Sequence, residues 1–463
     1  MNNLEDKFFV WNTWTDMYQY KSQYNLLTEA EGLIVTNNRD KKHIDGMSSM
    51  FNCSLGYGNR EVIRAINEQL LKMSAGTVFR TTTEPSYHLA KKLCALTNNH
   101  FKHVFFVNSG SEACDTAIKM VQQYYWNQDI NKYKIISLKG CYHGSTLGAL
   151  STCTFDSDVE PLRLRLDGFV SVDTFISKDS VNEKAEVKKA LDKLEECIVN
   201  EGADSIAALI FEPVQLSNEV NILPVSYLQG LKKLKEKYNF LLMSDEVATG
   251  FGRCGYMFYM EKAGFYPDIM MLAKGITSGY IPLGAVMATS EIFNAFLNLE
   301  GSYKNKLFRH GFTTSGNPIA CQCALAVIDY IEKNNLIENS HKMGILLKQK
   351  ISALKEKYHF ISCVQGEGLL IAVILSEEYS NKFKPVELSY LLRDFLCQKG
   401  LIVYPCNDRG QAILIAPPLT IDETYCDRIA AILDSGFRKC HQILINKTGE
   451  AYYEIAAEKE CKR

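Results

Sequence analysis

The sequence lacks the features of secreted, membrane-spanning or nucleic-acid-binding proteins. Its first residues, MNNLEDKFFVWNTW, contain acidic side chains and no apolar core of signal-peptide length. No apolar run elsewhere approaches the length of a membrane span. Lys and Arg number 51 against 53 Asp and Glu, so the net charge of -2 provides no basic field for a nucleic acid or an anionic membrane. We therefore expect a cytoplasmic protein with neither kind of partner.

The sequence also has no C-x-x-C motif, although it contains 15 cysteines. The cysteines are scattered, and the closest pair, Cys321 and Cys323, cannot supply a four-ligand zinc site alone. We expect buried, reduced thiols and no bound metal.

What is present is a chain of 463 residues, two to three times the usual size of one domain, with 46% hydrophobic residues. Apolar runs of strand length alternate with amphipathic helical stretches such as Val187–Val199 and Val225–Tyr238. All-apolar strands are typical of sheets covered on both faces, which favours an α/β fold with a mostly parallel sheet flanked by helices. The predicted strands lie at 103–108, 133–138, 207–213, 240–246 and 269–274.

The pattern changes after about residue 320, where long helical stretches are followed by apolar runs at 369–375 and 412–416. This pattern of helical stretches followed by apolar runs predicts a second, smaller α+β domain. We predict that residues 1–60 belong to this small domain and 61–318 form the large domain. Residues 319–445 would be the C-terminal part of the small domain, and 446–463 a frayed tail.

Three motifs follow predicted strands directly. In Asn108-Ser109-Gly110-Ser111-Glu112-Ala113, a strand turns into a helix whose free N–H groups favour a phosphate. Asp245 ends a second strand at the edge where α/β sheets bind ligands, and its carboxylate can pair with a protonated ring nitrogen. Lys274 ends a third strand, where desolvation disfavours its ammonium form and suits a Schiff-base lysine.

Each motif also has an ordinary interpretation. The Ser-Gly turn can be a simple helix cap, Asp245 a cap or salt-bridged turn residue, and Lys274 a surface lysine. The order of the motifs favours a functional site over these ordinary interpretations. A phosphate turn, the pair Tyr142-His143, a strand-end acid and a strand-end lysine follow one another along the chain.

A competing motif is Gly250-Phe251-Gly252-Arg253-Cys254-Gly255, which satisfies the G-x-G-x-x-G pattern of nicotinamide dinucleotide sites. It lies deep in the chain, no clear helix begins after it, and no matching ribose carboxylate follows. The dinucleotide interpretation is therefore disfavoured.

From about residue 30 to residue 440 the chain resembles class III, or omega, aminotransferases of fold type I, which use pyridoxal 5′-phosphate. The resemblance implies that fold: a large domain with a mostly parallel sheet and a small α+β domain from the two chain ends. The residues that carry it are NSGSEA, CYHGSTLGAL, FEPVQ, DEVATGFGRCG, PDIMMLAKGITSGYIPLGA and HGFTTSGNP.

The resemblance implies a role for each matching residue. Lys274 would form the Schiff base with the cofactor, and Asp245 would keep the pyridine nitrogen protonated so that the ring acts as an electron sink. Tyr142 would stack on one face of the ring and Val247 on the other. The remaining implied cofactor-binding residues are Gly110 and Ser111 at the phosphate, His143, Glu212, Phe312 and Thr313. Because Thr313 resembles a threonine that reaches the neighbouring subunit's phosphate, the resemblance implies a homodimer, with a tetramer as an alternative.

The substrate pocket is predicted from the same resemblance. Phe51 stands where amine-accepting relatives have an aromatic residue, and Val78 with Phe79 resembles a second hydrophobic wall. Leu414 replaces an arginine that ornithine-type members often carry, which makes Arg409 the nearest candidate to bind a carboxylate. Phe51 as plain core and Arg409 as a solvated loop residue are the alternatives.

The predicted reaction is a ping-pong transfer of an amino group from an amine or amino acid to a 2-oxo acid, with Lys274 moving the proton. Aminomutase, decarboxylase or racemase chemistry on the same scaffold is one alternative. A binding protein that keeps the fold without the chemistry is the other.

Overall fold

The structure is a computed structural model of one chain. It describes residues 9–15, 17, 26–154, 166–173, 182–298, 305–376, 385–406 and 411–445. Within these ranges every cysteine is free of disulfide bonds, and most are buried. No helix in the described ranges is long and apolar enough to cross a membrane.

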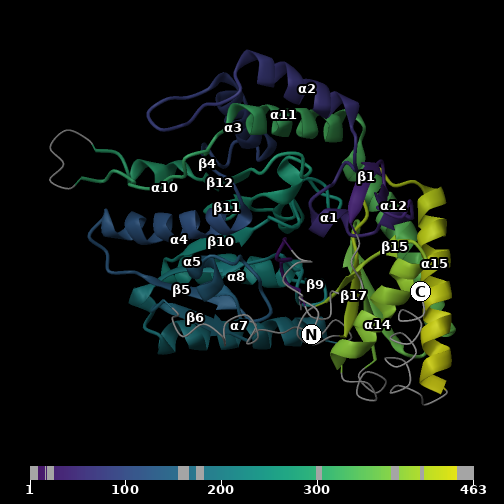
Figure 1. Ribbon diagram of the computed structural model, residues 1–463. Helices are drawn as coiled ribbons and strands as arrows, with labels where there is room; N and C mark the ends of the chain where they lie inside the picture. Colours follow the sequence, from purple (N-terminus) through teal and green to yellow (C-terminus); the bar gives the residue numbers. More distant parts are fainter. Residues whose placement is uncertain are drawn as a thin grey trace.

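A seven-stranded sheet forms the centre of the molecule (Figure 1). Strand β12 is antiparallel to both of its neighbours, β4 and β11, and the other pairs are parallel. The mostly parallel sheet expected from the sequence is therefore confirmed. The strand order is β4 (His103–Val107), β12 (Gly284–Ala288), β11 (Ile269–Leu272), β10 (Leu241–Asp245), β7 (Ile206–Phe211), β5 (Lys134–Leu138) and β6 (Phe169–Val172).

Helices cover both faces of this sheet, because alternate side chains of each buried strand point in opposite directions. Ile210 and Met243 pack in the cluster that contains the apolar face of α4 (Gly110–Trp126). Leu209 and Leu242 pack in the opposite cluster with α7 (Glu183–Asn200) and α8 (Val225–Tyr238). The shorter helices of this region are α5 (Leu147–Thr152), α9 (Met260–Ala263), α10 (Ser290–Asn294), η3 (Ala203–Ser205) and η4 (Lys274–Ile276).

A layer of three helices lies beside the β4 edge of the sheet, above it in Figure 1. Helices α2 (Arg60–Lys72) and α3 (Glu84–Leu96) both pack against α11 (Pro318–Lys333). The apolar face of α11 contributes to the largest hydrophobic cluster among the described residues.

The described residues between 336 and 445 form a C-terminal unit at the right of Figure 1. Its antiparallel sheet has the order β13 (Ile361–Glu367), β14 (Leu370–Leu375), β17 (Ala412–Ile415), β16 (Tyr404–Pro405). Its helices are α12 (Leu336–Ser352), η5 (Ala353–Glu356), α14 (Pro385–Gln398) and α15 (Glu423–Ile445).

The beginning of the chain joins this C-terminal unit. Strands β1 (Leu27–Glu31), β2 (Ile34–Asn37) and β3 (Lys42–Asp45) form an antiparallel sheet, and β3 pairs in parallel with β15 (Leu401–Ile402). Segments from both chain ends thus lie side by side, as expected for the small domain. The exact boundaries at residues 60 and 318 stay a prediction.

Candidate active site

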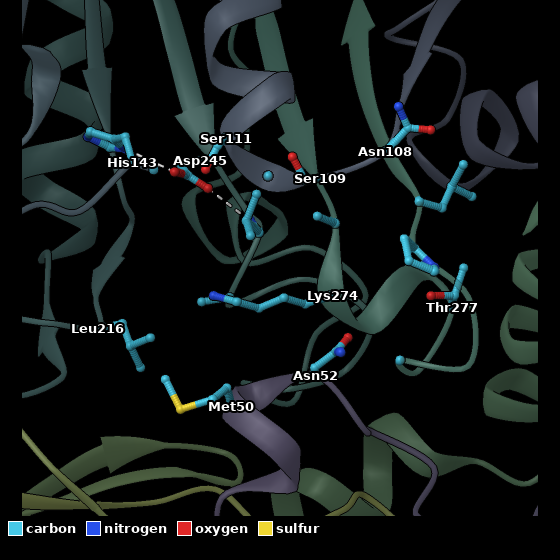
Figure 2. A pocket seen from close by; sticks show the side chains of 18 of the residues that line it. Met50, Asn52, Asn108, Ser109, Ser111, His143, Leu216, Asp245, Lys274 and Thr277 are labelled. Carbon is cyan, nitrogen blue, oxygen red and sulfur yellow. Dashed lines mark hydrogen bonds and ion pairs between the residues drawn. The ribbon is translucent and has the colours of Figure 1, made fainter. Parts of the chain in front are cut away.

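A cavity of about 380 Å³ opens at the carboxyl ends of β10 and β11 and at the start of α4 (Figure 2). Carboxyl ends of parallel strands are where α/β sheets bind ligands. The residues that line the cavity come from segments distant in the sequence: Ser49, Met50, Asn52, Asn108–Ser111, Tyr142–Gly144, Glu212, Leu216, Asp245, Val247, Ala248, Ala273, Lys274, Thr277, Gly279 and Ile281–Leu283.

One wall of the cavity is the turn from β4 into α4. Ser109 caps the helix, because its side chain accepts a 3.2 Å hydrogen bond from the backbone N–H of Glu112. A side chain at Gly110 would place its Cβ 3.0 Å from Val247 Cγ1, so only glycine fits without a shift. The first N–H groups of a helix have no intrahelical partner, and the helix dipole favours an anion there. This turn is suited to a phosphate group.

Asp245 and His143 form a buried pair at the closed end of the cavity. His143 donates from Nδ1 to Asp245 Oδ2 at 2.9 Å, and the N–H of Val247 donates to Asp245 Oδ1 at 3.0 Å. Burial alone would lower the pKa of His143, but the bond to Asp245 and the contact with Cys141 outweigh it and raise that pKa well above its ordinary value. The imidazolium form is therefore favoured, and the pair holds the carboxylate in one orientation.

Glu212 follows β7 and lies at the same end of the cavity. Its carboxylate accepts hydrogen bonds from the N–H groups of Tyr142, at 2.9 Å, and Leu216, at 3.3 Å. Burial, with the charge of Asp245, raises the pKa of Glu212 to about 7, although His143 and these N–H groups act in the opposite direction. Glu212 is thus more easily protonated than an exposed glutamate.

Lys274 begins η4 directly after β11, and its backbone is in the left-handed region at φ 44°. Burial lowers the pKa of Lys274, while Asp245 and Glu212 partly oppose the shift. Figure 2 shows the Lys274 side chain crossing the cavity, with Asp245 and His143 on one side and Met50 and Asn52 on the other. A lowered pKa increases the fraction of neutral amine, which is the nucleophilic form.

Tyr142 lines the cavity near its opening, and its hydroxyl lies 2.7 Å from Ser145 Oγ. The ring of Trp14 packs on Tyr142 edge to face, with centroids 5.9 Å apart. Trp14 remains 57% exposed. The sequence gives no signal for this contact, because no local motif connects residue 14 to residue 142.

Most of the residues predicted to hold the cofactor meet in this cavity. They are Gly110, Ser111, Tyr142, His143, Glu212, Asp245, Val247 and Lys274. Leu216, Ile281 and Leu283 contribute further apolar surface to the cavity wall that was not predicted from the sequence. The only sequence signal for a place in the cavity was that these residues lie close to the FEPVQ motif or to Lys274.

The prediction for Phe51 is corrected by the structure. Phe51 is buried and packs edge to face on Tyr404 at 6.0 Å, within an apolar cluster that includes Val214 and Leu414. Its neighbour Met50 lines the cavity instead. The reason is a left-handed turn at residues 48–51, which directs Met50 into the cavity and Phe51 into the core.

Val78, Phe79, Phe312 and Thr313 do not line the cavity of this chain. A Cβ at Gly316 would lie 2.5 Å from Val78 Cγ1, and one at Gly311 would lie 3.1 Å from Phe79 Cζ. Val78 and Phe79 therefore lie against the loop that carries Phe312 and Thr313, and both Phe79 and Thr313 are exposed. Arg409 lies outside the described residues.

The competing glycine motif does not form a dinucleotide turn. Gly252 and Gly255 make tight turns at positive φ, and the next helix, α9, begins only at Met260 and has four residues. Arg253 in its middle is buried and donates to backbone carbonyls of the C-terminal unit.

The donors and acceptors in the cavity fit a phosphorylated pyridine aldehyde. The α4 turn suits the phosphate, the oriented Asp245 carboxylate suits a protonated ring nitrogen, and the Lys274 amine suits an aldehyde. Tyr142 and Val247 also line the cavity. Fold and site together define a pyridoxal-phosphate enzyme of fold type I.

Comparison with known proteins identifies the family. The family model for class III aminotransferases matches residues 17–436. Adenosylmethionine-8-amino-7-oxononanoate aminotransferase of Methanocaldococcus jannaschii is 32% identical over 440 residues, which cover 90% of this chain and 94% of that protein. The chain therefore belongs to the class III aminotransferase family.

Solved structures agree with this assignment. The PLP-bound amine transaminase of an uncultivated Pseudomonas species is similar with a TM-score of 0.87 and 30% identity, covering 93% of this chain and 99% of that chain. An (S)-enantioselective omega-transaminase from Thermomicrobium roseum has a TM-score of 0.86 and 33% identity, covering 93% and 96%. The protein is a transaminase that uses pyridoxal 5′-phosphate, as the sequence resemblance predicted.

Proposed function

We propose that Lys274 is the catalytic residue of an amino-group transfer from an amine with an apolar body to a 2-oxo acid. The observation that supports this proposal most directly is that the Lys274 side chain crosses the cavity that the α4 anion turn and the buried Asp245 carboxylate also line. Aminomutase, decarboxylase and racemase activities are disfavoured, because the similar proteins described above are aminotransferases.

Lys274 would act first as the neutral amine that binds the cofactor and then as the base. Burial lowers its pKa, which increases the fraction of the free amine relative to an exposed lysine. When bound, pyridoxal phosphate supplies a ring that withdraws electrons from the carbon carrying the amino group. Lys274 would take the proton from that carbon and return it to the cofactor side.

The remaining cavity residues would position the ring. Asp245 would hold the proton on the ring nitrogen, and the hydrogen bond from His143 would keep Asp245 oriented. Tyr142 and Val247 would pack on opposite faces of the ring. Gly110 and Ser111 would hold the phosphate at the start of α4.

The cavity wall supports an amine with an apolar body. Met50, Leu216 and Ile281 contribute apolar surface. Among the lining residues, all within the described ranges, Lys274 is the only Lys or Arg. Arg409 stays the predicted partner for a substrate carboxylate, and Arg409→Ala should weaken the oxo-acid half-reaction at least tenfold while sparing the amine half-reaction.

We also propose a homodimer, or a tetramer built from such dimers, in which the loop carrying Phe312 and Thr313 serves the partner's cavity. The exposure of Thr313 supports this arrangement, as do Val78 and Phe79 against the same loop. Thr314 next to it donates to Asn108 Oδ1 at 2.7 Å, which ties the loop to the phosphate turn. The cytoplasmic location stays a prediction.

The test is a screen of amine donors with the purified holoenzyme, scored by loss of the cofactor's visible absorption band. A productive donor should bleach the band, and a 2-oxo acid should restore it, with one equivalent consumed per donor amine converted to its carbonyl product. Lys274→Ala should bind the cofactor but fail both steps. Carbon dioxide release without consumption of an oxo acid would instead indicate a decarboxylase.

A further inference from the structure

Four consecutive residues, none of them glycine, adopt the left-handed backbone conformation beside the active site. They form α1 (Ser48–Phe51), where φ is 47° at Ser48 and Ser49, 65° at Met50 and 64° at Phe51. The Phe51 N–H donates to Met47 O at 2.7 Å, so the segment is a left-handed helical turn. Such a turn brings each Cβ close to a carbonyl oxygen and persists only where the surroundings fix it.

Asp45, the last residue of β3, fixes the start of this turn. Its Oδ1 accepts from the N–H of Met47 at 3.1 Å, and its Oδ2 accepts from the N–H of Ser49 at 2.8 Å. The hydroxyl of Tyr57 donates to the same Oδ2 at 2.7 Å. Asp45 is 2% exposed, so water competes little for these bonds.

A second anchor ties the turn to both parts of the molecule. Ser48 Oγ donates to Ala416 O at 2.6 Å and accepts from Arg253 Nη2 at 3.2 Å. Arg253 is buried in the loop after β10 and also donates to Pro417 O at 2.5 Å. The turn therefore sits where the central sheet meets the C-terminal unit.

The turn supplies one wall of the cavity. Ser49, Met50 and Asn52 line the cavity, and Figure 2 shows Met50 and Asn52 across Lys274 from Asp245. Because Asp245 and the α4 turn take the ring and phosphate, this wall faces the space left for substrate. A Cβ at Gly279 would lie 2.7 Å from Asn52 Nδ2, so the turn also contacts the loop after Lys274.

We propose that Asp45 is a positioning residue for transamination: it holds the left-handed turn that shapes the substrate side of the cavity. The proposal rests on the proposed function of Lys274. Asp45 does not touch the cofactor space itself, since it is absent from the cavity lining. It acts through the backbone N–H groups of Met47 and Ser49.

The test compares three holoenzymes. One carries Asp45→Asn alone, and the other two are double variants that combine Asp45→Asn with Ser49→Gly or with Ser49→Ala. Asp45→Asn should retain the cofactor band and lower kcat/KM of the amine half-reaction about tenfold or more, the effect of losing a charged hydrogen bond. Ser49→Gly should restore most of the rate, because glycine adopts the left-handed conformation without penalty. Ser49→Ala removes the same hydroxyl but keeps the Cβ, so it should restore nothing.

Two results would overturn the proposal: a rate for Asp45→Asn within twofold of wild type, or equal effects of Ser49→Gly and Ser49→Ala. If Asp45→Asn does not fold, Tyr57→Phe removes one of the three hydrogen bonds and should give a smaller loss with the same glycine-specific rescue. A wild-type enzyme that consumes no oxo acid would contradict the proposed function instead. Even then, Ser49→Gly should unfold at a higher temperature than Ser49→Ala if the turn is strained.

Discussion

The hydrogen bond from His143 Nδ1 to Asp245 Oδ2, 2.9 Å long, fixes the carboxylate at the closed end of the active site. The N–H of Val247 holds the other oxygen, so the carboxylate cannot rotate freely. Catalytic groups whose orientation is set before the substrate arrives need little reorganisation during the reaction.

This relationship predicts different effects for two substitutions of His143. His143→Phe removes the donor and should lower kcat about tenfold or more, because a charged hydrogen bond contributes about 1.5–3 kcal/mol. His143→Asn can keep a donor near the position of Nδ1 and should retain more of the rate. Steady-state kinetics on both variants checks this, and equal losses would argue against an orienting role for the donor.

Asp245→Asn should be more damaging, because a neutral amide cannot hold a proton on the ring nitrogen. We expect the cofactor to bind and kcat to fall at least a hundredfold, about 3 kcal/mol. Single-turnover measurements of the amine half-reaction give the rate, and absorbance gives the cofactor content. A variant within a factor of two of wild type would refute the assignment of Asp245.

Shared active sites predict complementation between a Thr313 variant and a Lys274 variant. Chains carrying Thr313→Ala mixed with chains carrying Lys274→Ala should form hybrid dimers in which one site is complete. Activity should rise after subunit exchange toward a fraction of the wild-type value. Proven hybrids without activity would show that Thr313 does not act across the interface.

Glu246 predicts a pH dependence of stability. Burial raises its pKa to about 7, whereas an exposed glutamate titrates near ~4.3. Between these values the folded chain binds a proton that the unfolded chain has released, so the fold weakens as the pH rises.

Urea unfolding of wild type and Glu246→Gln at pH 5 and pH 8 isolates this effect, because Glu212 is common to both proteins. Relative to the variant, wild type should lose about 1–3 kcal/mol of unfolding free energy at the higher pH. If the difference in unfolding free energy between wild type and Glu246→Gln is the same at both pH values, the pKa of Glu246 is not raised by folding.

The strands were predictable where their residues are large and apolar. The run at 240–246 became β10, and Asp245 at its end reached the cavity as predicted. Strand β12 was missed, because Gly284-Ala285-Val286-Met287-Ala288 consists mainly of small residues and carries little strand signal. Its antiparallel pairing with β4 and β11 depends on tertiary packing.

The wall formed by residues 48–51 was not predictable from the local sequence. Nothing in Met47-Ser48-Ser49-Met50-Phe51 favours a left-handed turn, and glycine is the residue expected there. The turn depends on Asp45 and on contacts from Arg253 and Ala416, which are far away in the sequence. This is why Phe51 was expected in the cavity and Met50 was found there.

The order of the central sheet has a consequence for synthesis of the chain. Strand β4 leaves the ribosome early, but its partner β12 ends at Ala288. Until then β4 has no strand partner in this sheet, and the loop carrying Lys274 lacks the strand that follows it. Chains with such distant pairings fold slowly and expose unpaired edges to aggregation. A nascent chain halted before residue 284 should therefore be a chaperone client without a cofactor site, so cofactor loading follows completion of the sheet.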